Sequence, residues 1–377
     1  MLGRPVRDVD LVVETGVSAF ARALAEILGA RLREHGRFAT ATITLPDGTR
    51  FDLAAPRRES YPHPASLPVV EPGAGIEEDL ARRDFTINAM ALRIAPGAHR
   101  LVDPNGGARD LALGIIRMLH GSSALDDPTR AFRAVRYANR LGFRLAAATR
   151  SAIARAVREK AFDFVSGDRL RRELELVLSE TGRGSAARRI HALRLDTAVD
   201  PGLLLRRQDA ARIGRAEAIA RRSGQTVGWL CFLLSWMGEA SPARLRRVAD
   251  RLAIAGRSRA ALEAWPETRR AVSAALATRA RTEIARQARR LSPEELVAAA
   301  ATLKPSDRAK LLRSAQQRVS LGIGGKELVS AGIPPGPAIG AALARAREAR
   351  EDGRIAPREE LEFALRAARG ILRGTNG

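Results

Sequence analysis

The pattern of apolar residues changes once along this chain, between about residue 118 and residue 126. Before that point, short alternating runs at 9–14, 40–45 and 49–54 predict strands, and apolar residues at helical spacing predict a helix over 18–35. Beyond it, Ala, Leu, Arg and Glu dominate and the pattern is helical almost throughout. The sequence therefore predicts an α+β protein, with a mixed α/β head followed by an all-α remainder.

Arginine accounts for most of the charge. Lys and Arg total 64 against 42 Asp and Glu, a formal net charge of +22, and only four of the basic residues are lysines. A bias in base composition explains why arginine replaces lysine, but it does not explain the basic surplus. That surplus indicates a polyanionic partner such as nucleic acid, and the planar guanidinium suits phosphate.

Cysteine content and hydropathy exclude several classes of protein. The single cysteine, Cys231, rules out an intramolecular disulfide. The apolar run over 227–237 is far shorter than the ~20 residues that a membrane-spanning helix requires. No apolar signal region begins the sequence, so we expect a cytoplasmic protein without a membrane partner. Nothing in the sequence indicates an oligomeric state.

Two acidic residues at the start of the first predicted strand form the first candidate site. One residue separates Asp8 from Asp10, so both side chains project from one face of a strand and can bind a pair of Mg²⁺ ions. By itself such a pair is more often a solvated strand end. Asp52, on the second strand of the hairpin predicted around Pro46-Asp-Gly48, is either a third metal ligand or the polar face of a half-buried strand.

A second set of motifs is more specific. It comprises Glu-Glu-Asp-Leu-Ala-Arg-Arg-Asp-Phe-Thr-Ile-Asn-Ala-Met-Ala at 77–91, Asp-Pro-Asn-Gly-Gly at 103–107, Ile-Arg-Met-Leu at 116–119, Asp-Asp-Pro-Thr-Arg-Ala-Phe-Arg-Ala-Val-Arg-Tyr-Ala at 126–138, and Leu-Gly-Phe at 141–143. In their order and spacing, these blocks closely resemble the tRNA CCA-adding and poly(A) polymerase family of nucleotidyltransferases. A later segment, 168–178, resembles the part of these enzymes that closes the neck.

Four charged residues follow one another at intervals of three: Asp127, Arg130, Arg133 and Arg136. Such residues drift only slowly around a helix. By themselves they fit an exposed helix with an Asp127–Arg130 ion pair. They also suit a nucleotide, because a carboxylate accepts from an exocyclic amino group and arginine donates to ring acceptors. The resemblance favours the second interpretation, in which Asp127 and Arg130 pair with the Watson–Crick edge of CTP or ATP.

The resemblance implies roles for the other motif residues as well. Asp8 and Asp10 would be catalytic Mg²⁺ ligands, with Asp52 as the third catalytic carboxylate. Arg83 would contact the nucleotide, and Arg133 and Arg136 would face its triphosphate or brace the pocket. The expected structural residues are Asp84 and Asn88, between head and neck, and Phe85 and Phe132, in the core.

The resemblance also divides the chain. It implies a nucleotidyltransferase head with a polymerase-β-like sheet over 1–120, a helical neck that includes the templating helix over 121–185, a helical body over 186–300 and a helical tail over 301–377. The Gly/Pro-rich segment 325–340 in the tail resembles an element that grips tRNA through its phosphates. The alternative is a helix-capping loop without an RNA role.

The family's glycine-rich phosphate loop normally precedes the two aspartates, whereas only residues 1–7 precede them here. We expect either a start codon assigned too far downstream or a shortened, inactive member. The resemblance implies a tRNA nucleotidyltransferase that adds C, A or both from CTP and ATP. The alternatives are a poly(A) polymerase of the same family and a non-catalytic RNA-binding remnant.

Overall fold

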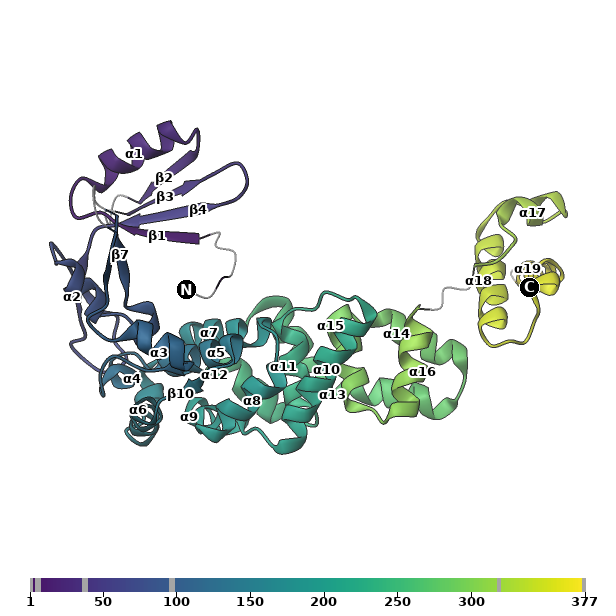
Figure 1. Cartoon of the computed structure of the whole chain (residues 1–377). Coiled ribbons are helices and arrows are strands. Elements are labelled where there is room, and N and C mark those ends of the chain that lie inside the picture. Colours follow the sequence, from purple (N-terminus) through teal and green to yellow (C-terminus); the bar gives the residue numbers. More distant parts are fainter. Residues whose placement is uncertain (1–2, 4–7, 36–39, 95–98, 317–319, 375–377) are drawn as a thin grey trace. The chain divides into compact units, whose positions relative to one another are not determined.

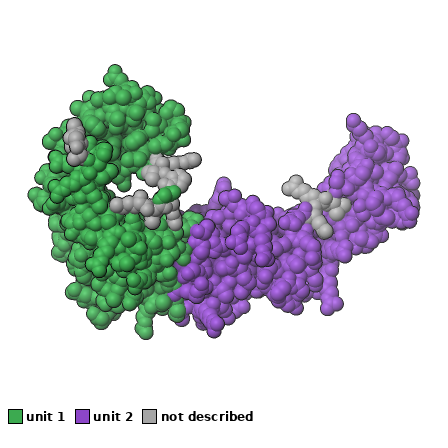
Figure 2. Space-filling model, viewed as in Figure 1, with its two compact units in different colours: residues 1–180, 189–201 green, residues 181–188, 202–377 purple. Residues whose placement is uncertain are grey.

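The computed structural model describes residues 3, 8–35, 40–94, 99–316 and 320–374 (Figure 1). The chain forms two compact units (Figure 2). Unit 1 comprises residues 1–180 and 189–201, and unit 2 comprises residues 181–188 and 202–377. This division confirms an α+β unit followed by a helical one, and the finer boundaries at 120, 185 and 300 stay predictions.

Unit 1 begins with a four-stranded sheet in the order β1-β4-β3-β2. β1 (Asp8–Val12) runs parallel to β4 (Arg50–Ala54), whereas β3 (Thr40–Thr44) is antiparallel to both β4 and β2 (Arg31–His35). The predicted hairpin is confirmed, since Gly48 adopts a φ of 86° in the turn and Leu45 N donates to Thr49 O at 2.8 Å.

One face of this sheet is apolar and is covered by helix α1 (Val17–Ile27), as Figure 1 shows. The buried residues of this small core are Val17, Ala21, Ala25, Ala41, Ile43 and Leu53. Because side chains alternate across a strand, the packing of one face against α1 leaves the other face to the polar residues of the same strands.

The helix predicted over 18–35 is wrong in its second half. α1 ends at Ile27, and residues 31–35 form β2 instead. Gly29 adopts a φ of 56°, which ends the helix, and the five residues after Ala30 pair with β3 along their whole length. Backbone pairing with a neighbouring strand overrides the local helical spacing.

The rest of unit 1 consists of small hairpins and helices. The hairpins pair β5 (Arg57–Ser60) with β6 (Val69–Pro72) and β7 (Ala91–Arg93) with β8 (Arg100–Val102). The parallel pair is β9 (Ile115–Ile116) with β10 (Arg144–Leu145). The helical elements are α2 (Ile76–Ala81), η2 (Thr86–Asn88), α3 (Gly107–Leu113), α4 (Ser123–Asp126), α5 (Thr129–Leu141), α6 (Ala147–Arg158), η3 (Ala161–Phe164), α7 (Gly167–Ser179) and α9 (Leu195–Val199).

Unit 2 is helical in its described part. Its elements are α10 (Arg207–Ser223), α11 (Trp229–Met237), α12 (Pro242–Arg251), α13 (Gly256–Thr278), α14 (Arg281–Arg290), α15 (Pro293–Thr302), α16 (Pro305–Gln316), α17 (Gly325–Ser330), α18 (Pro337–Glu351), η5 (Pro357–Glu359) and α19 (Glu360–Gly374). α8 (Arg183–Ala192) and η4 (Pro201–Leu203) each contribute residues to both units. Trp236, Trp265 and Cys231 are buried in unit 2, so the single thiol lies in its core.

In the described part of the chain, no helix combines the length and the apolar character needed to cross a membrane.

Candidate active site

The three predicted carboxylates lie on the face of the sheet opposite α1. Asp10 on β1 lies opposite Asp52 on β4, which lies opposite Thr42 on β3. Residues directly opposite each other in paired strands share a face, so these three side chains form one polar row. Asp8 lies two residues before Asp10 and therefore on the same face, in register with Arg50. The strand register thus places Asp52 beside Asp10, on the polar face of the sheet.

Neighbouring side chains hold the Asp52 carboxylate. Thr42 Oγ1 donates to Asp52 Oδ1 at 2.7 Å, and Arg50 Nη2 lies 3.2 Å from both carboxylate oxygens. The Asp52 side chain is 41% exposed, so these contacts orient the carboxylate while leaving it open to solvent. Asp8 and Asp10 are exposed as well.

These residues provide hard oxygen donors, the ligand type that Mg²⁺ prefers. In the described residues, no three His, Cys, Asp or Glu side chains approach closely enough to hold a metal ion. The chemistry of the donors fits a divalent cation, and the row provides two opposed carboxylates, those of Asp10 and Asp52, with Asp8 beside them.

Arg83 follows the end of α2 and contacts that helix. Its Nη2 is 3.1 Å from Asp79 Oδ2, and Asp79 also binds Arg82 at 2.7 Å. The two guanidinium groups hold the pKa of the Asp79 carboxyl below its usual value despite the opposing effect of burial, which is the largest single influence. Asp79 therefore stays ionised and fixes the two arginines.

Asp84 connects this segment to α5, as predicted. Its Oδ1 accepts from Asn88 Nδ2 and from Phe85 N, each at 2.9 Å, and its Oδ2 accepts from Arg133 Nε at 2.7 Å. Phe85 is fully buried and Phe132 nearly so, which confirms both as core residues. Arg133 thus braces the junction between the Arg-Arg-Asp-Phe-Thr block and α5.

Asp127 lies just before α5 and is held by three donors. Thr129 N and Thr129 Oγ1 donate to its Oδ1 at 3.0 and 2.6 Å, and Arg169 Nη2 donates to the same oxygen at 2.8 Å. The first of these bonds caps the start of the helix. The ion pair expected from spacing, Asp127 with Arg130, is replaced by a pair with Arg169 of α7.

Arg130 is buried and binds three other elements. Its Nη1 donates to Ser123 Oγ at 2.7 Å, and its Nη2 donates to the Tyr61 hydroxyl and the Arg82 carbonyl at 3.2 and 3.0 Å. The guanidinium carbon also lies 5.7 Å from the centre of the Tyr61 ring. The interpretation of these residues as an exposed, salt-bridged helix is therefore wrong, because tertiary contacts bury two of the three arginines, Arg130 and Arg136.

Three side-chain atoms of charged residues in unit 1 are buried without a hydrogen-bond partner in the described structure: Nε of Arg83, Nε of Arg136 and Oε2 of Glu173. Arg136 packs over the Tyr137 ring at 5.5 Å, and its Nε lies 3.9 Å from Glu180. Since buried polar groups are normally paired, each of these three atoms can make one further hydrogen bond.

Arg169 and Glu173, both on α7, are the site residues that sequence reasoning missed. Arg169 Nη1 donates to Ala65 O at 2.9 Å, so this side chain joins the loop between β5 and β6 to Asp127. Burial raises the pKa of the Glu173 carboxyl, while the charges of Arg136 and Arg133 oppose that shift. The sequence does contain a sign that Glu173 is buried, because this residue falls on the same helix face as the apolar residues Leu170, Leu174 and Val177.

The chain resembles known proteins over most of its length. Residues 1–117 match the family model of the poly A polymerase head domain. The CC-adding tRNA nucleotidyltransferase of Deinococcus radiodurans is 33% identical over 373 residues, which cover 98% of this chain and 87% of that protein. The A-adding tRNA nucleotidyltransferase of Geobacter sulfurreducens is 33% identical over 386 residues, which cover 98% of this chain but 44% of that protein. The chain thus spans less than half the length of this A-adding relative.

Solved structures agree with these relatives. The structure of the Thermotoga maritima CCA-adding enzyme complexed with tRNA superposes with a TM-score of 0.77 at 27% identity, covering 97% of this chain and 88% of that one. With this coverage, the match extends into both compact units. This chain therefore belongs to the tRNA nucleotidyltransferase and poly(A) polymerase family.

Proposed function

We propose that this chain transfers nucleotides from CTP, ATP or both to the 3′ end of a tRNA. The register of β1 and β4 is the observation that supports the proposal most strongly, because it sets Asp10 opposite Asp52 on the sheet face away from α1. A row of solvent-accessible carboxylates on a sheet face suits metal-dependent nucleotidyl transfer. Membership of the family supplies the reaction class, and the relatives supply tRNA as the acceptor.

Magnesium is the ion that we propose for this site. Asp8 and Asp10 would hold it, and Asp52 would join them once the side chains approach more closely than in the structure. When bound, the ion would neutralise phosphate charge and lower the pKa of the attacking hydroxyl. The chain's own residues prepare the site. Thr42 fixes the rotation of the Asp52 carboxylate, and the Arg50 guanidinium balances its charge. Because that ion pair is nearly half exposed, exchanging it for another cation costs little.

Base choice is assigned to the residues at the start of α5. Cytosine N4 and adenine N6 carry amino groups that donate to a carboxylate, whereas uracil and guanine present an oxygen at that position. Asp127 is the proposed acceptor. Arg130 is the proposed donor to the ring, for which its buried guanidinium would have to exchange contacts with Ser123, Tyr61 and Arg82. The Nε atoms of Arg83 and Arg136 are buried without a hydrogen-bond partner, which supports a role for these arginines in binding the triphosphate.

The test uses tRNA transcripts that lack one, two or three 3′ nucleotides, incubated with the 377-residue chain, Mg²⁺ and each labelled nucleoside triphosphate in turn. We expect incorporation of C, A or both, and none of G or U. Asp10→Asn should abolish incorporation and leave tRNA binding unchanged. Glu14→Gln, at an exposed position beyond β1, is the matched control and should retain activity. Failure of the chain to incorporate any nucleotide would falsify the proposal.

A second function, template-independent polyadenylation, is favoured by the matched description of the head domain. An unstructured RNA in the same assay separates the two. Adenylation of that RNA in preference to tRNA would identify a poly(A) polymerase. Binding of tRNA without incorporation into either RNA would identify a non-catalytic RNA-binding protein.

A further inference from the structure

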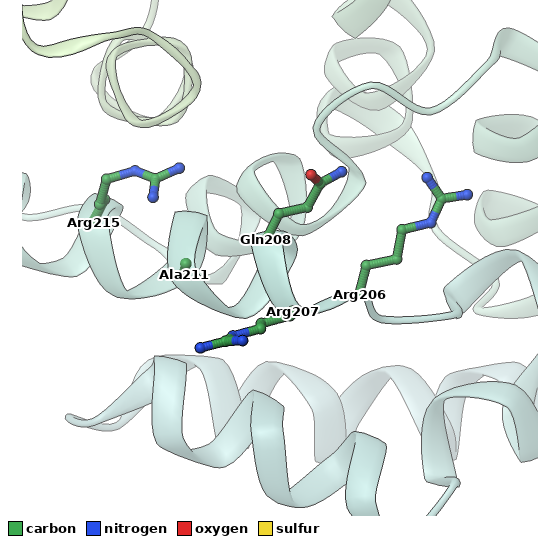
Figure 3. Close-up of a pocket in the computed structure, with 5 residues that line it drawn as sticks. All are labelled: Arg206, Arg207, Gln208, Ala211 and Arg215. Carbon is green, nitrogen blue, oxygen red and sulfur yellow. The ribbon is translucent and has the colours of Figure 1, made fainter.

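An open pocket lies at the start of α10 in unit 2, outside the motifs that define the family. Its volume is about 640 Å³, and its lining residues are Arg206, Arg207, Gln208, Ala211 and Arg215 (Figure 3). None of the five is acidic or aromatic. A ligand of this pocket would therefore meet positive charge and one side-chain amide, and no aromatic ring or carboxylate among the lining residues.

Helical spacing explains how the lining forms. Arg207, Ala211 and Arg215 follow one another at intervals of four, so they lie along one face of α10. The small side chain of Ala211 leaves space between the two longer ones. In Figure 3, the side chains of Arg206, Gln208 and Arg215 extend to the same side, whereas Arg207 extends away from them.

The arginine side chains, and not the end of the helix, provide the binding capacity. The carboxylate of Asp209 already accepts from Arg206 N at 2.8 Å, and it also pairs with the buried Arg212. The acidic residue next to the pocket is therefore already engaged. Arg206 and Arg207 are exposed, so their charge faces solvent.

Arg215 adds positive charge that is partly buried. Its Nε donates to the carbonyl of Ala301, at the end of α15, at 3.0 Å. Burial lowers the pKa of its guanidinium, and the nearby charges of Arg308 and Arg212 lower it further. An anion in the pocket would relieve the repulsion among these positive charges.

We propose that this pocket binds backbone phosphates of the RNA substrate. The inference rests on the proposed function for the identity of the RNA. Guanidinium groups bind phosphate through paired hydrogen bonds, and contacts to exposed arginines position a nucleic acid without reading its sequence. A free nucleotide fits less well, because the lining offers no aromatic or acidic residue to recognise a base.

Two variants of the whole chain test the pocket. Arg206→Ala combined with Arg207→Ala removes two charges, and Ala211→Glu places a carboxylate between the remaining groups. Arg215 is left unchanged, because it also holds the Ala301 carbonyl. Each variant has a matched control on an exposed position of unit 2 outside the pocket.

The control for the double variant is Arg246→Ala with Arg257→Ala, which removes the same number of charges. The control for Ala211→Glu is Ala243→Glu, the same substitution on an exposed position of α12. Fluorescence anisotropy of a labelled tRNA transcript, repeated over a series of salt concentrations, gives Kd and its salt dependence. Thermal unfolding curves establish that all four proteins are folded.

We expect the double variant and Ala211→Glu each to raise Kd roughly tenfold at low salt. The slope of log Kd against log salt should fall by about 1 for each phosphate that the variant no longer binds. The controls should bind as the unmodified chain does. The proposal is overturned if the pocket variants match their controls. It is also overturned if free CTP or pyrophosphate occupies the pocket and RNA affinity is unaffected.

The binding assay separates this proposal from the proposed function. If the chain binds tRNA through the pocket and incorporates no nucleotide, the proposed activity is refuted and the proposed phosphate site is supported. If the chain incorporates nucleotides and the pocket variants bind tRNA normally, the proposed phosphate site is refuted and the proposed activity is supported. At tRNA concentrations well above Kd, the pocket variants should retain the kcat of the unmodified chain.

Discussion

Arg169→Ala tests whether a residue of α7 positions the proposed base-reading carboxylate. In the structure, the Arg169 guanidinium donates to Asp127 Oδ1 at 2.8 Å and to the Ala65 carbonyl at 2.9 Å. Removing it leaves Asp127 with the two bonds from Thr129, whereas Ala65 N still donates to the carbonyls of Leu125 and Asp126 at 3.1 Å. The carboxylate can then rotate, and the preference for bases that carry an amino group should weaken.

The structure sets the size of the effect. A hydrogen bond between charged groups contributes about 1.5–3 kcal/mol when shielded from water. The two side chains are 28% and 19% exposed, so solvent screening favours the lower end, about 1.5 kcal/mol. Since about 1.4 kcal/mol corresponds to a factor of ten, the discrimination against UTP and GTP should fall roughly tenfold.

The assay is the ratio of kcat/KM for CTP to that for UTP, and for ATP to that for GTP, at saturating tRNA. Arg169→Lys keeps the charge but loses the planar fork, so its ratio should lie between those of the alanine variant and the unmodified chain. Arg172→Ala is the control on the same helix, because Arg172 lies on α7 and its side chain is exposed.

The reasoning is refuted if Arg169→Ala keeps full discrimination while Asp127→Ala loses it. An equal loss of kcat/KM with all four nucleotides would also contradict a positioning role, since it would indicate general damage to the fold. Circular dichroism and the melting temperature of each variant distinguish these cases from unfolding.

Three further predictions concern stability and reactivity. Burial raises the pKa of Glu173, so the folded state binds the proton more tightly than the unfolded state, and this stabilisation is lost as the pH rises through the folded-state pKa. Glu173→Gln should therefore raise Tm at about pH 7.5 and change it little near pH 4.5. An equal change in Tm at both pH values would contradict this. Burial raises the pKa of the Cys231 thiol to about 12, so a thiol reagent at about pH 8 should label it only after denaturation, and rapid labelling of the folded chain would refute this. A Cβ on Gly107 would overlap the Thr86 carbonyl oxygen, so Gly107→Ala should cost about 1–3 kcal/mol by urea unfolding. Gly370→Ala, in open space on α19, should be neutral or slightly stabilising, and equal losses in both variants would refute the steric argument.

Local signals in the sequence predicted several elements correctly. The alternation over 40–45 and 49–54 with its intervening turn corresponds to β3 and β4. The helix over 18–35 failed where a glycine with positive φ ended α1 and the following residues paired with β3. Periodicity describes a segment by itself, whereas strand pairing depends on a neighbour from elsewhere in the chain.

Motif order and side-chain alternation are properties of the chain, so they were enough to predict the family, the helical character beyond residue 126 and the shared face of Asp8 and Asp10. Only the tertiary structure decided that Asp52 lies opposite Asp10, since the register of two strands far apart in the sequence is fixed by non-local hydrogen bonds. Only the tertiary structure showed that Arg130 is buried against Tyr61 and that Asp127 pairs with Arg169. Burial and partner choice depend on which elements pack together, and spacing within one helix does not contain that information.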